Sequence, residues 1–178
     1  YSEPEGLDHA LDRAGYVALD ESRVMAFELG AGPAVTAAPV GLVAVDVVEF
    51  ARIAGMLRNS PPGVVAAEVE RMSYATLPAR CLVLYEEAQP VACGSVVIDA
   101  ECAGVFNMVT ASERRGRGYA AAIVQALLAH AVVAGARLAY LQVDAANAPA
   151  RHIYERFGFR DRYAYWYRAA PASEGKTP

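Results

Sequence analysis

The sequence predicts an α+β fold: a mixed, mostly antiparallel sheet with a central parallel β-α-β crossover and flanking helices. One observation is a series of three β-branched runs, at residues 81–85, 91–98 and 104–110, separated by short turns as in an antiparallel meander. The other is a long apolar helix pattern over 118–134, followed by a buried strand at 138–143. Two strands joined by such a crossover helix run parallel, with a right-handed connection.

Two helices are expected before the meander. Residues 41–45 are typical of a strand, and Asp46 is a suitable N-cap for a helix over 47–58. The proline pair in NSPPG ends that helix, and a second helix is expected over 64–75.

The last elements follow the crossover. Asn147 is expected to cap a helix over 149–157, which Gly158 ends. Short strands at 159–160 and 163–168 then complete the predicted sheet.

Three parts are predicted along the chain: an extension and linker (1–39), the main domain (40–170) and a polar tail (171–178). The extension holds a helix at 5–14, closed by Gly15, a strand at 22–29 and a Gly/Pro/Ala-rich linker. Its order of helix, Gly-aromatic pair and strand echoes residues 151–168. The extension is therefore interpreted either as the remnant of a degenerate preceding unit or as a strand added to the sheet edge.

Composition narrows the function classes. The 178 residues carry a net charge of −4, which argues against a non-specific nucleic-acid binder. No uncharged apolar run reaches the ~18 residues of a membrane span, and the acidic first residues do not resemble a secretory signal. The odd count of three cysteines, without metal-ligand spacing, predicts reduced thiols packed in the core and a cytoplasmic protein.

A glycine- and arginine-rich segment, Arg115-Gly116-Arg117-Gly118-Tyr119-Ala120, stands between a predicted strand and the long helix. Glycines let several backbone N–H groups converge, and a helix N-terminus adds unpaired N–H groups and partial positive charge. The segment therefore predicts a site for a pyrophosphate, with Arg114, Arg115 and Arg117 at its rim. A solvated charged turn is the alternative, and a single RG-type RNA patch is a weaker one.

Asn147 and Tyr154 are seven residues apart, so that both lie on one face of the predicted helix. Taken alone, Asn147 is a helix cap and Tyr154 a core aromatic.

Together, these residues resemble the GNAT superfamily of acyl-CoA N-acyltransferases over residues 104–168. The loop pattern [QR]xxGxG/A is matched by Arg115, Gly118 and Ala120. A second pattern, NxxAxxxYxxxGF, is matched by Asn147, Ala150, Tyr154, Gly158 and Phe159. Both occur in the right order and in the right elements.

The resemblance implies an acetyl-CoA site where the two parallel strands splay apart. Tyr154 would be the general acid for the departing thiolate, and acetyl-CoA would be a co-substrate with no metal required. The implied cofactor-binding residues are Met108, Val109 and Thr110 for the pantetheine arm and thioester carbonyl, Arg115, Gly116, Arg117, Gly118, Tyr119, Ala120 and Ala121 for the pyrophosphate, and Asn147 for pantetheine.

The sequence departs from the family pattern at Gln142. In the branch that acetylates ribosomal-protein N-termini, a glutamate there serves as general base, and glutamine cannot take up a proton. Other acidic candidates stand out no further than surface or cap carboxylates; they are Glu70, Asp99, Glu101 and Asp144. Loss of the amine proton through water is the alternative. The usual proline after the fourth strand is also replaced, by Ala111-Ser112.

Tyr163, Tyr165 and Tyr167 alternate with Trp166 and Arg168 on the final strand, which places the two sets on opposite faces. Sheet packing, a wall of the acceptor pocket and a homodimer contact are the three interpretations of the tyrosine face.

The expected function is that of an N-acetyltransferase acting on a primary amine of a small molecule or protein, without nucleic-acid or membrane partners. The alternative is a catalytically silent CoA-binding or regulatory module, suggested by the missing glutamate and the degenerate copy.

Overall fold

The computed structural model describes residues 6–31 and 39–171. Most of the predicted linker, the tail beyond residue 171 and the first five residues lie outside these ranges. The helices are α1 (Leu7–Arg13), α2 (Val47–Arg58), α3 (Pro62–Ser73), α4 (Tyr119–Val133) and α5 (Ala148–Phe157), with short 3₁₀ turns at Leu29–Ala31 and Ser112–Arg114. The strands are β1 (Val17–Glu28), β2 (Leu42–Val45), β3 (Ala79–Glu86), β4 (Gln89–Asp99), β5 (Cys102–Thr110), β6 (Leu138–Asp144) and β7 (Arg160–Ala169).

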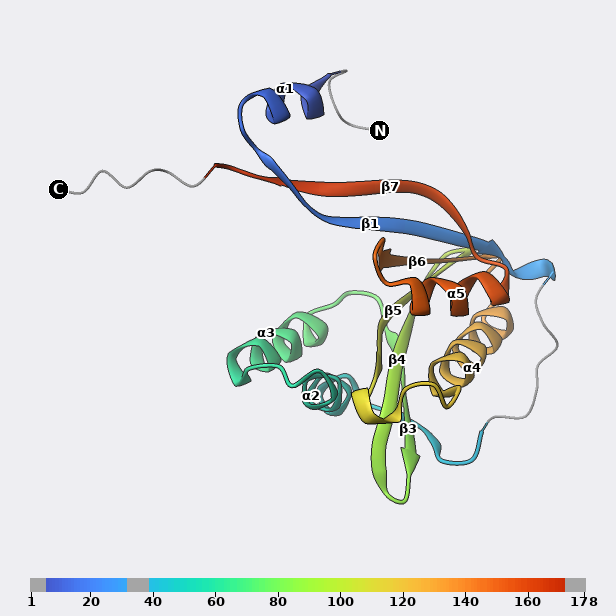
Figure 1. The fold of residues 1–178 in the computed structure, drawn as a ribbon. Coiled ribbons are helices and arrows are strands. Elements are labelled where there is room, and N and C mark those ends of the chain that lie inside the picture. Colours follow the sequence, from blue (N-terminus) through green and yellow to red (C-terminus); the bar gives the residue numbers. More distant parts are fainter. Residues whose placement is uncertain (1–5, 32–38, 172–178) are drawn as a thin grey trace.

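All described strands join one mixed sheet in the order β2-β3-β4-β5-β6-β1-β7. Its parallel pair is β5 with β6, connected through α4, and the other pairings are antiparallel. The predicted α+β architecture with a meander and a central crossover is therefore confirmed. In Figure 1, α2 and α3 lie on one side of this sheet, and α4 and α5 on the other.

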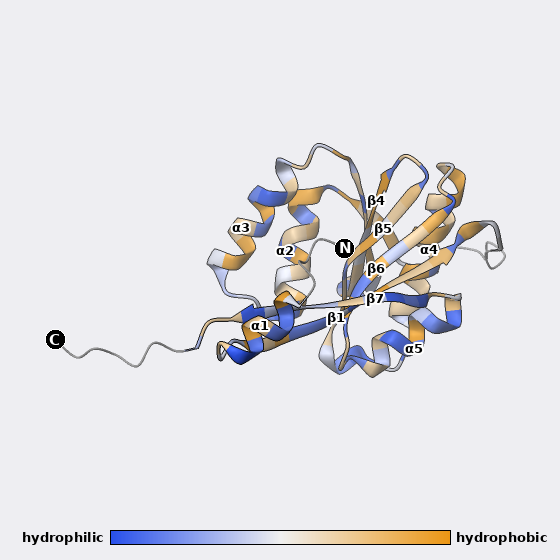
Figure 2. Ribbon diagram, turned by 90° about the horizontal axis from the view of Figure 1, so that it is seen from above, coloured by the Kyte–Doolittle hydropathy of each residue, from blue (hydrophilic) through white to orange (hydrophobic). Residues whose placement is uncertain are grey.

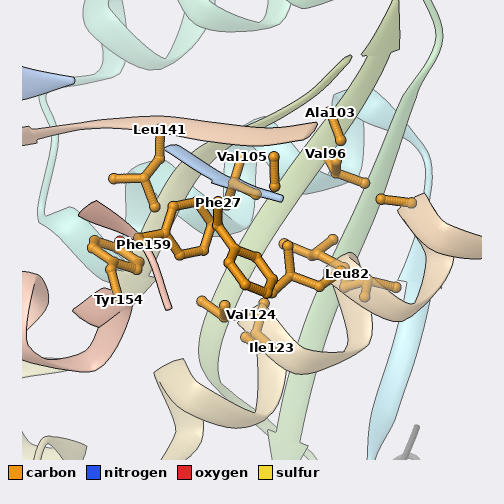
Figure 3. Packing of buried hydrophobic residues seen from close by; sticks show 14 of the residues in the cluster. Phe27, Leu82, Val96, Ala103, Val105, Ile123, Val124, Leu141, Tyr154 and Phe159 are labelled. Carbon is orange, nitrogen blue, oxygen red and sulfur yellow. The ribbon is translucent and has the colours of Figure 1, made fainter. Parts of the chain in front are cut away.

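Two hydrophobic clusters hold the layers together. Under α2 and α3, Phe50 and Met72 pack on Cys81, Val83 and Cys93. The larger cluster joins α4 and α5 to the other face of the sheet, where Figure 3 shows aromatic and aliphatic side chains interleaved. Figure 2 shows α5 mostly in hydrophilic colours, as expected for a helix that buries a single stripe.

The cysteines agree with the predicted core role at two of three positions. Cys81 and Cys93 are buried and Cys102 is half-buried, and all three are free thiols. Burial raises the pKa of the Cys81 thiol to about 11 and that of Cys93 to about 12, so both are uncharged at neutral pH.

The start of α2 follows directly from local sequence. The Asp46 carboxylate accepts hydrogen bonds from the backbone N–H groups of Val48 (2.9 Å) and Glu49 (2.8 Å). It satisfies two donors that have no acceptor within the helix, and the predicted helix bounds are confirmed.

Removing this cap should have a measurable effect on stability. Asp46→Ala is expected to lower the free energy of unfolding by about 1 kcal/mol, whereas Asp46→Asn retains an oxygen acceptor and should stay close to the wild type. Urea unfolding of the three proteins checks this. Equal midpoints for Asp46→Ala and the wild type would contradict the capping role.

The N-terminal strand departs from expectation in length and place. It spans Val17–Glu28 rather than 22–29, and it lies inside the sheet between β6 and β7, not at an edge. Only Ser22–Glu28 pairs with β6, while the pairing with β7 reaches back to Val17, so the outer half of β1 and β7 forms a two-stranded ribbon. The division at residue 39 stays a prediction.

The prediction of two short strands at 159–160 and 163–168 was wrong. This segment forms one continuous strand, β7. Its pairing with β1 is irregular where consecutive residues Val24 and Met25 pair with Tyr163 and Asp161, which leaves one residue of β7 without a partner in β1. The extra residue there is accommodated by the bulge, so the strand is not interrupted.

Candidate acyl-CoA site

The parallel strands β5 and β6 are paired at one end only. Their partners run from Cys102 and Leu138 to Val105 and Leu141. Past that point, β5 continues through Thr110 and β6 through Asp144, and within the described chain neither stretch pairs with the other. The predicted residues Met108, Val109 and Thr110 lie on this separated part of β5.

The glycine-rich loop ends at the N-terminus of α4. Gly116 and Gly118 have φ angles of 78° and 83°, in the left-handed region that favours glycine, and Gly118 is the N-cap. A Cβ built on either glycine would meet no heavy atom within 4 Å, so protein atoms do not fill the space over the loop. Tyr119, Ala120 and Ala121 form the first turn of α4, whose N–H groups have no intrahelical acceptor. This geometry suits an anion, and the predicted pyrophosphate site at the loop stays a prediction.

A carboxylate that sequence reasoning missed lies beside this loop. Glu86, at the end of β3, accepts hydrogen bonds from Arg114 (2.5 Å) and the Tyr119 hydroxyl (2.5 Å), and lies 3.5 Å from Arg117. The bond from Tyr119, followed by the charges of Arg114 and Arg117, holds the pKa of Glu86 below its usual range. No sequence motif marks Glu86, because the hairpin that brings it to the loop lies about 30 residues earlier.

The contact with Glu86 affects the role expected for Arg114 and Arg117 as phosphate ligands at the rim of the loop. Arg114 and Arg117 are paired with Glu86, whose negative charge competes with a phosphate for the two guanidinium groups. Among the described residues, Glu86 is bonded to side chains of this region and not to the backbone amides of the loop.

Neutralising Glu86 should tighten binding of a phosphate-bearing ligand. Glu86→Gln removes a negative charge from the rim and frees two guanidinium groups, so the Kd for acetyl-CoA is expected to fall about 3- to 10-fold at low salt and less at high salt. The matched control is Glu87→Gln, which makes the same charge change at the adjacent, exposed turn position. Weaker binding by Glu86→Gln would mean that Glu86 supports the loop rather than competing for it.

Tyr154 lies on α5, with 7% of its surface exposed. It packs edge to face on Phe159, at 6.0 Å between ring centroids, and Figure 3 shows the two rings side by side. Met108 and Tyr119 pack against the same hydrophobic cluster. Burial raises the pKa of the Tyr154 hydroxyl to about 12, so this group keeps its proton at neutral pH. A protonated hydroxyl is the form that a general acid requires.

Asn147 is the N-cap of α5, which confirms the local reading of this residue. Its side-chain oxygen accepts from the Ala150 N–H at 3.2 Å. A bond to pantetheine, which stays a prediction, would fall to the side-chain nitrogen.

The four acidic residues considered as a general base differ in their surroundings. Asp144 accepts from the Ala146 N–H at 2.7 Å, and Glu101 pairs with Arg137 at 3.3 Å. Glu70 and Asp99 are exposed. The side-chain oxygen of Gln142, the residue that departs from the expected glutamate of one branch, accepts from the Tyr165 hydroxyl at 2.8 Å.

The predicted alternation of the aromatic strand is confirmed. Trp166 and Arg168 both donate to Asp8 of α1, at 2.7 and 2.8 Å, and so fasten α1 to one face of β7. Tyr165 and Tyr167 contact each other on the opposite face, at 6.0 Å between ring centroids. The pocket-wall and dimer interpretations of that face stay predictions.

Two further findings concern the described residues alone. No described helix is long and apolar enough to cross a membrane. Over the same residues, no group of three or more His, Cys, Asp and Glu side chains could hold a metal ion.

Comparison with known proteins decides the family. The model of the acetyltransferase (GNAT) family matches residues 51–159, which include the loop, β5, β6 and α5. The chain belongs to the GNAT acetyltransferase family. No curated protein sequence matches it significantly.

Solved GNAT structures share the fold. One is a GNAT-family acetyltransferase from Novosphingobium aromaticivorans, with 23% identity, a TM-score of 0.63 and coverage of 84% of this chain and 64% of the other. A GCN5-related N-acetyltransferase from Kribbella flavida has 21% identity, a TM-score of 0.66 and coverage of 94% and 65%. A tandem GNAT protein from the clavulanic acid biosynthesis pathway has 17% identity, a TM-score of 0.68 and coverage of 97% and 61%. The chain thus spans less than two thirds of the length of these GNAT structures.

Proposed function

We propose that this chain is an N-acetyltransferase that transfers an acetyl group from acetyl-CoA to a primary amine of a small molecule or protein. The observations that support the proposal are the end of the β5–β6 pairing at Val105 and Leu141 and two groups expected to act there. These groups are the uncovered glycine loop at the start of α4 and the buried, protonated Tyr154 on α5.

Each part of the site has a role in binding the co-substrate. The amides of Gly116 to Ala121 hold the pyrophosphate, with partial positive charge from α4. The separated part of β5 offers backbone groups to the pantetheine arm, as an added strand would find them. An N–H group among Met108, Val109 and Thr110 polarises the thioester carbonyl.

The reaction is a direct attack in a ternary complex. The amine nitrogen adds to the thioester carbonyl carbon, the C–S bond breaks, and the departing sulfur takes the proton of Tyr154. The nitrogen releases its proton to water, because Gln142 cannot accept one. Tyr154 then recovers a proton from solvent.

A silent CoA-binding module is the second candidate, and Gln142 is the observation that favours it. The two candidates differ in turnover, not in binding.

Release of free thiol from acetyl-CoA, measured against a broad panel of amines that includes polyamines, amino acids and peptides, tests the proposal. Amine-dependent release with acetylated product detected by mass spectrometry supports the transferase. Acetyl-CoA binding without release on any amine would favour the silent module.

A further inference from the structure

Strand β5 contains a bulge next to the segment proposed to hold the thioester. Phe106 pairs with Ser95 and Val109 with Cys93, so Asn107 and Met108 together oppose the single residue Gly94. Asn107 has a φ angle of 54°, in the left-handed region. Asparagine is one of the few residues other than glycine that adopt this conformation readily.

The Asn107 side chain connects this bulge to α2 and α3, the two helices that lie together on one side of the sheet. Its oxygen accepts from the Arg58 guanidinium at the end of α2, at 3.3 Å. Its nitrogen donates to the Glu68 carboxylate on α3, also at 3.3 Å. An amide is suited to this position because it offers an acceptor and a donor.

Glu68 is itself fixed in place. Arg71 donates to both its oxygens, at 2.6 and 2.9 Å. The Arg71 hydrogen bonds lower the pKa of Glu68, so this half-buried carboxylate stays charged and is poorly suited to act as a base. Its role is that of a fixed acceptor.

We propose that Asn107 is a positioning residue: its clamp to Arg58 and Glu68 sets the bulge, and thereby the backbone of Met108, Val109 and Thr110, relative to the α2–α3 layer. The inference rests on the proposed function, in which an N–H group among those three residues polarises the thioester carbonyl. A small displacement of such donors costs rate, since the carbonyl oxygen must meet them at hydrogen-bond distance in the transition state.

The test separates the side chain from the backbone conformation. Asn107→Gly keeps the left-handed turn and removes both bonds. Asn107→Asp keeps the acceptor for Arg58 and places a second carboxylate against Glu68. Two measurements are made on the full chain: hydrogen exchange of the amides at 106–110 without ligand, and kcat together with the Kd for acetyl-CoA.

Both variants are expected to exchange these amides on the order of 10-fold faster than the wild type. Turnover should fall on the order of 10-fold, with the Kd for acetyl-CoA changed less than about 2-fold. A structural role alone would lower the melting temperature without this split between kcat and Kd.

Exchange at the wild-type rate in Asn107→Gly would overturn the clamp. Faster exchange with unchanged kcat would overturn the positioning role. If the wild type itself transfers acetyl to no amine, the catalytic half falls together with the proposed function, while the exchange comparison still decides whether the clamp exists.

Discussion

Replacing Tyr154 by phenylalanine is expected to lower kcat by roughly 10²- to 10⁴-fold, the range typical for loss of a general acid. The Kd for acetyl-CoA should change little, because the substitution keeps the ring and its contact with Phe159. Without the hydroxyl, the sulfur must leave as a thiolate or take its proton from water. Steady-state kinetics and calorimetry on the same preparation measure the two quantities.

The matched control is Tyr74→Phe, which removes a hydroxyl from a side chain that is 80% exposed. It should leave kcat and Kd unchanged. A wild-type kcat in Tyr154→Phe would remove Tyr154 from the mechanism. The pH profile adds a further check: because the pKa of Tyr154 is raised to about 12, its deprotonation should cause no loss of activity between pH 7 and about 10.

A negative charge at Gly118 is expected to weaken binding of acetyl-CoA strongly. Asp and Asn both tolerate the left-handed conformation at this position and have nearly the same size, so Gly118→Asp and Gly118→Asn differ mainly in charge. At about 5 Å from a pyrophosphate and an effective dielectric constant near 20, one added charge costs about 3 kcal/mol, or on the order of 100-fold in Kd.

Calorimetric titration of the two Gly118 variants with acetyl-CoA measures this difference. Because a Cβ at Gly118 meets no neighbouring atom, the two melting temperatures should be close to each other. Equal affinity of the Asp and Asn variants would show that the pyrophosphate does not lie at this loop.

Local signals predicted most helices and the meander well. The Asp46 cap, the proline pair after Arg58 and the left-handed glycine after Phe157 act within a few residues, so the bounds of α2 and the end of α5 follow from the sequence. The glycine loop and Tyr154 were assigned to the site through their resemblance to GNAT motifs of fixed spacing, and their roles stay predictions.

Long-range pairing was not predictable in this way. Nothing in Val17–Glu28 indicates that it pairs with β6 on one side and β7 on the other, because its partners lie more than 100 residues away. The contacts of Glu86 with the loop depend on the same kind of tertiary approach. Asn107 did give a signal, a polar residue within the apolar run GVFNMVT, and such a residue can be examined as a candidate bulge.

The most direct test of the account is calorimetric titration of the purified wild-type chain with acetyl-CoA, with desulfo-CoA and ATP as comparison ligands. We expect micromolar binding of acetyl-CoA, similar binding of desulfo-CoA and weak binding of ATP, because the site is proposed to recognise the pyrophosphate and the pantetheine arm together. No binding of acetyl-CoA, or binding no tighter than that of ATP, would contradict the assignment of this loop and the β5–β6 opening as an acyl-CoA site.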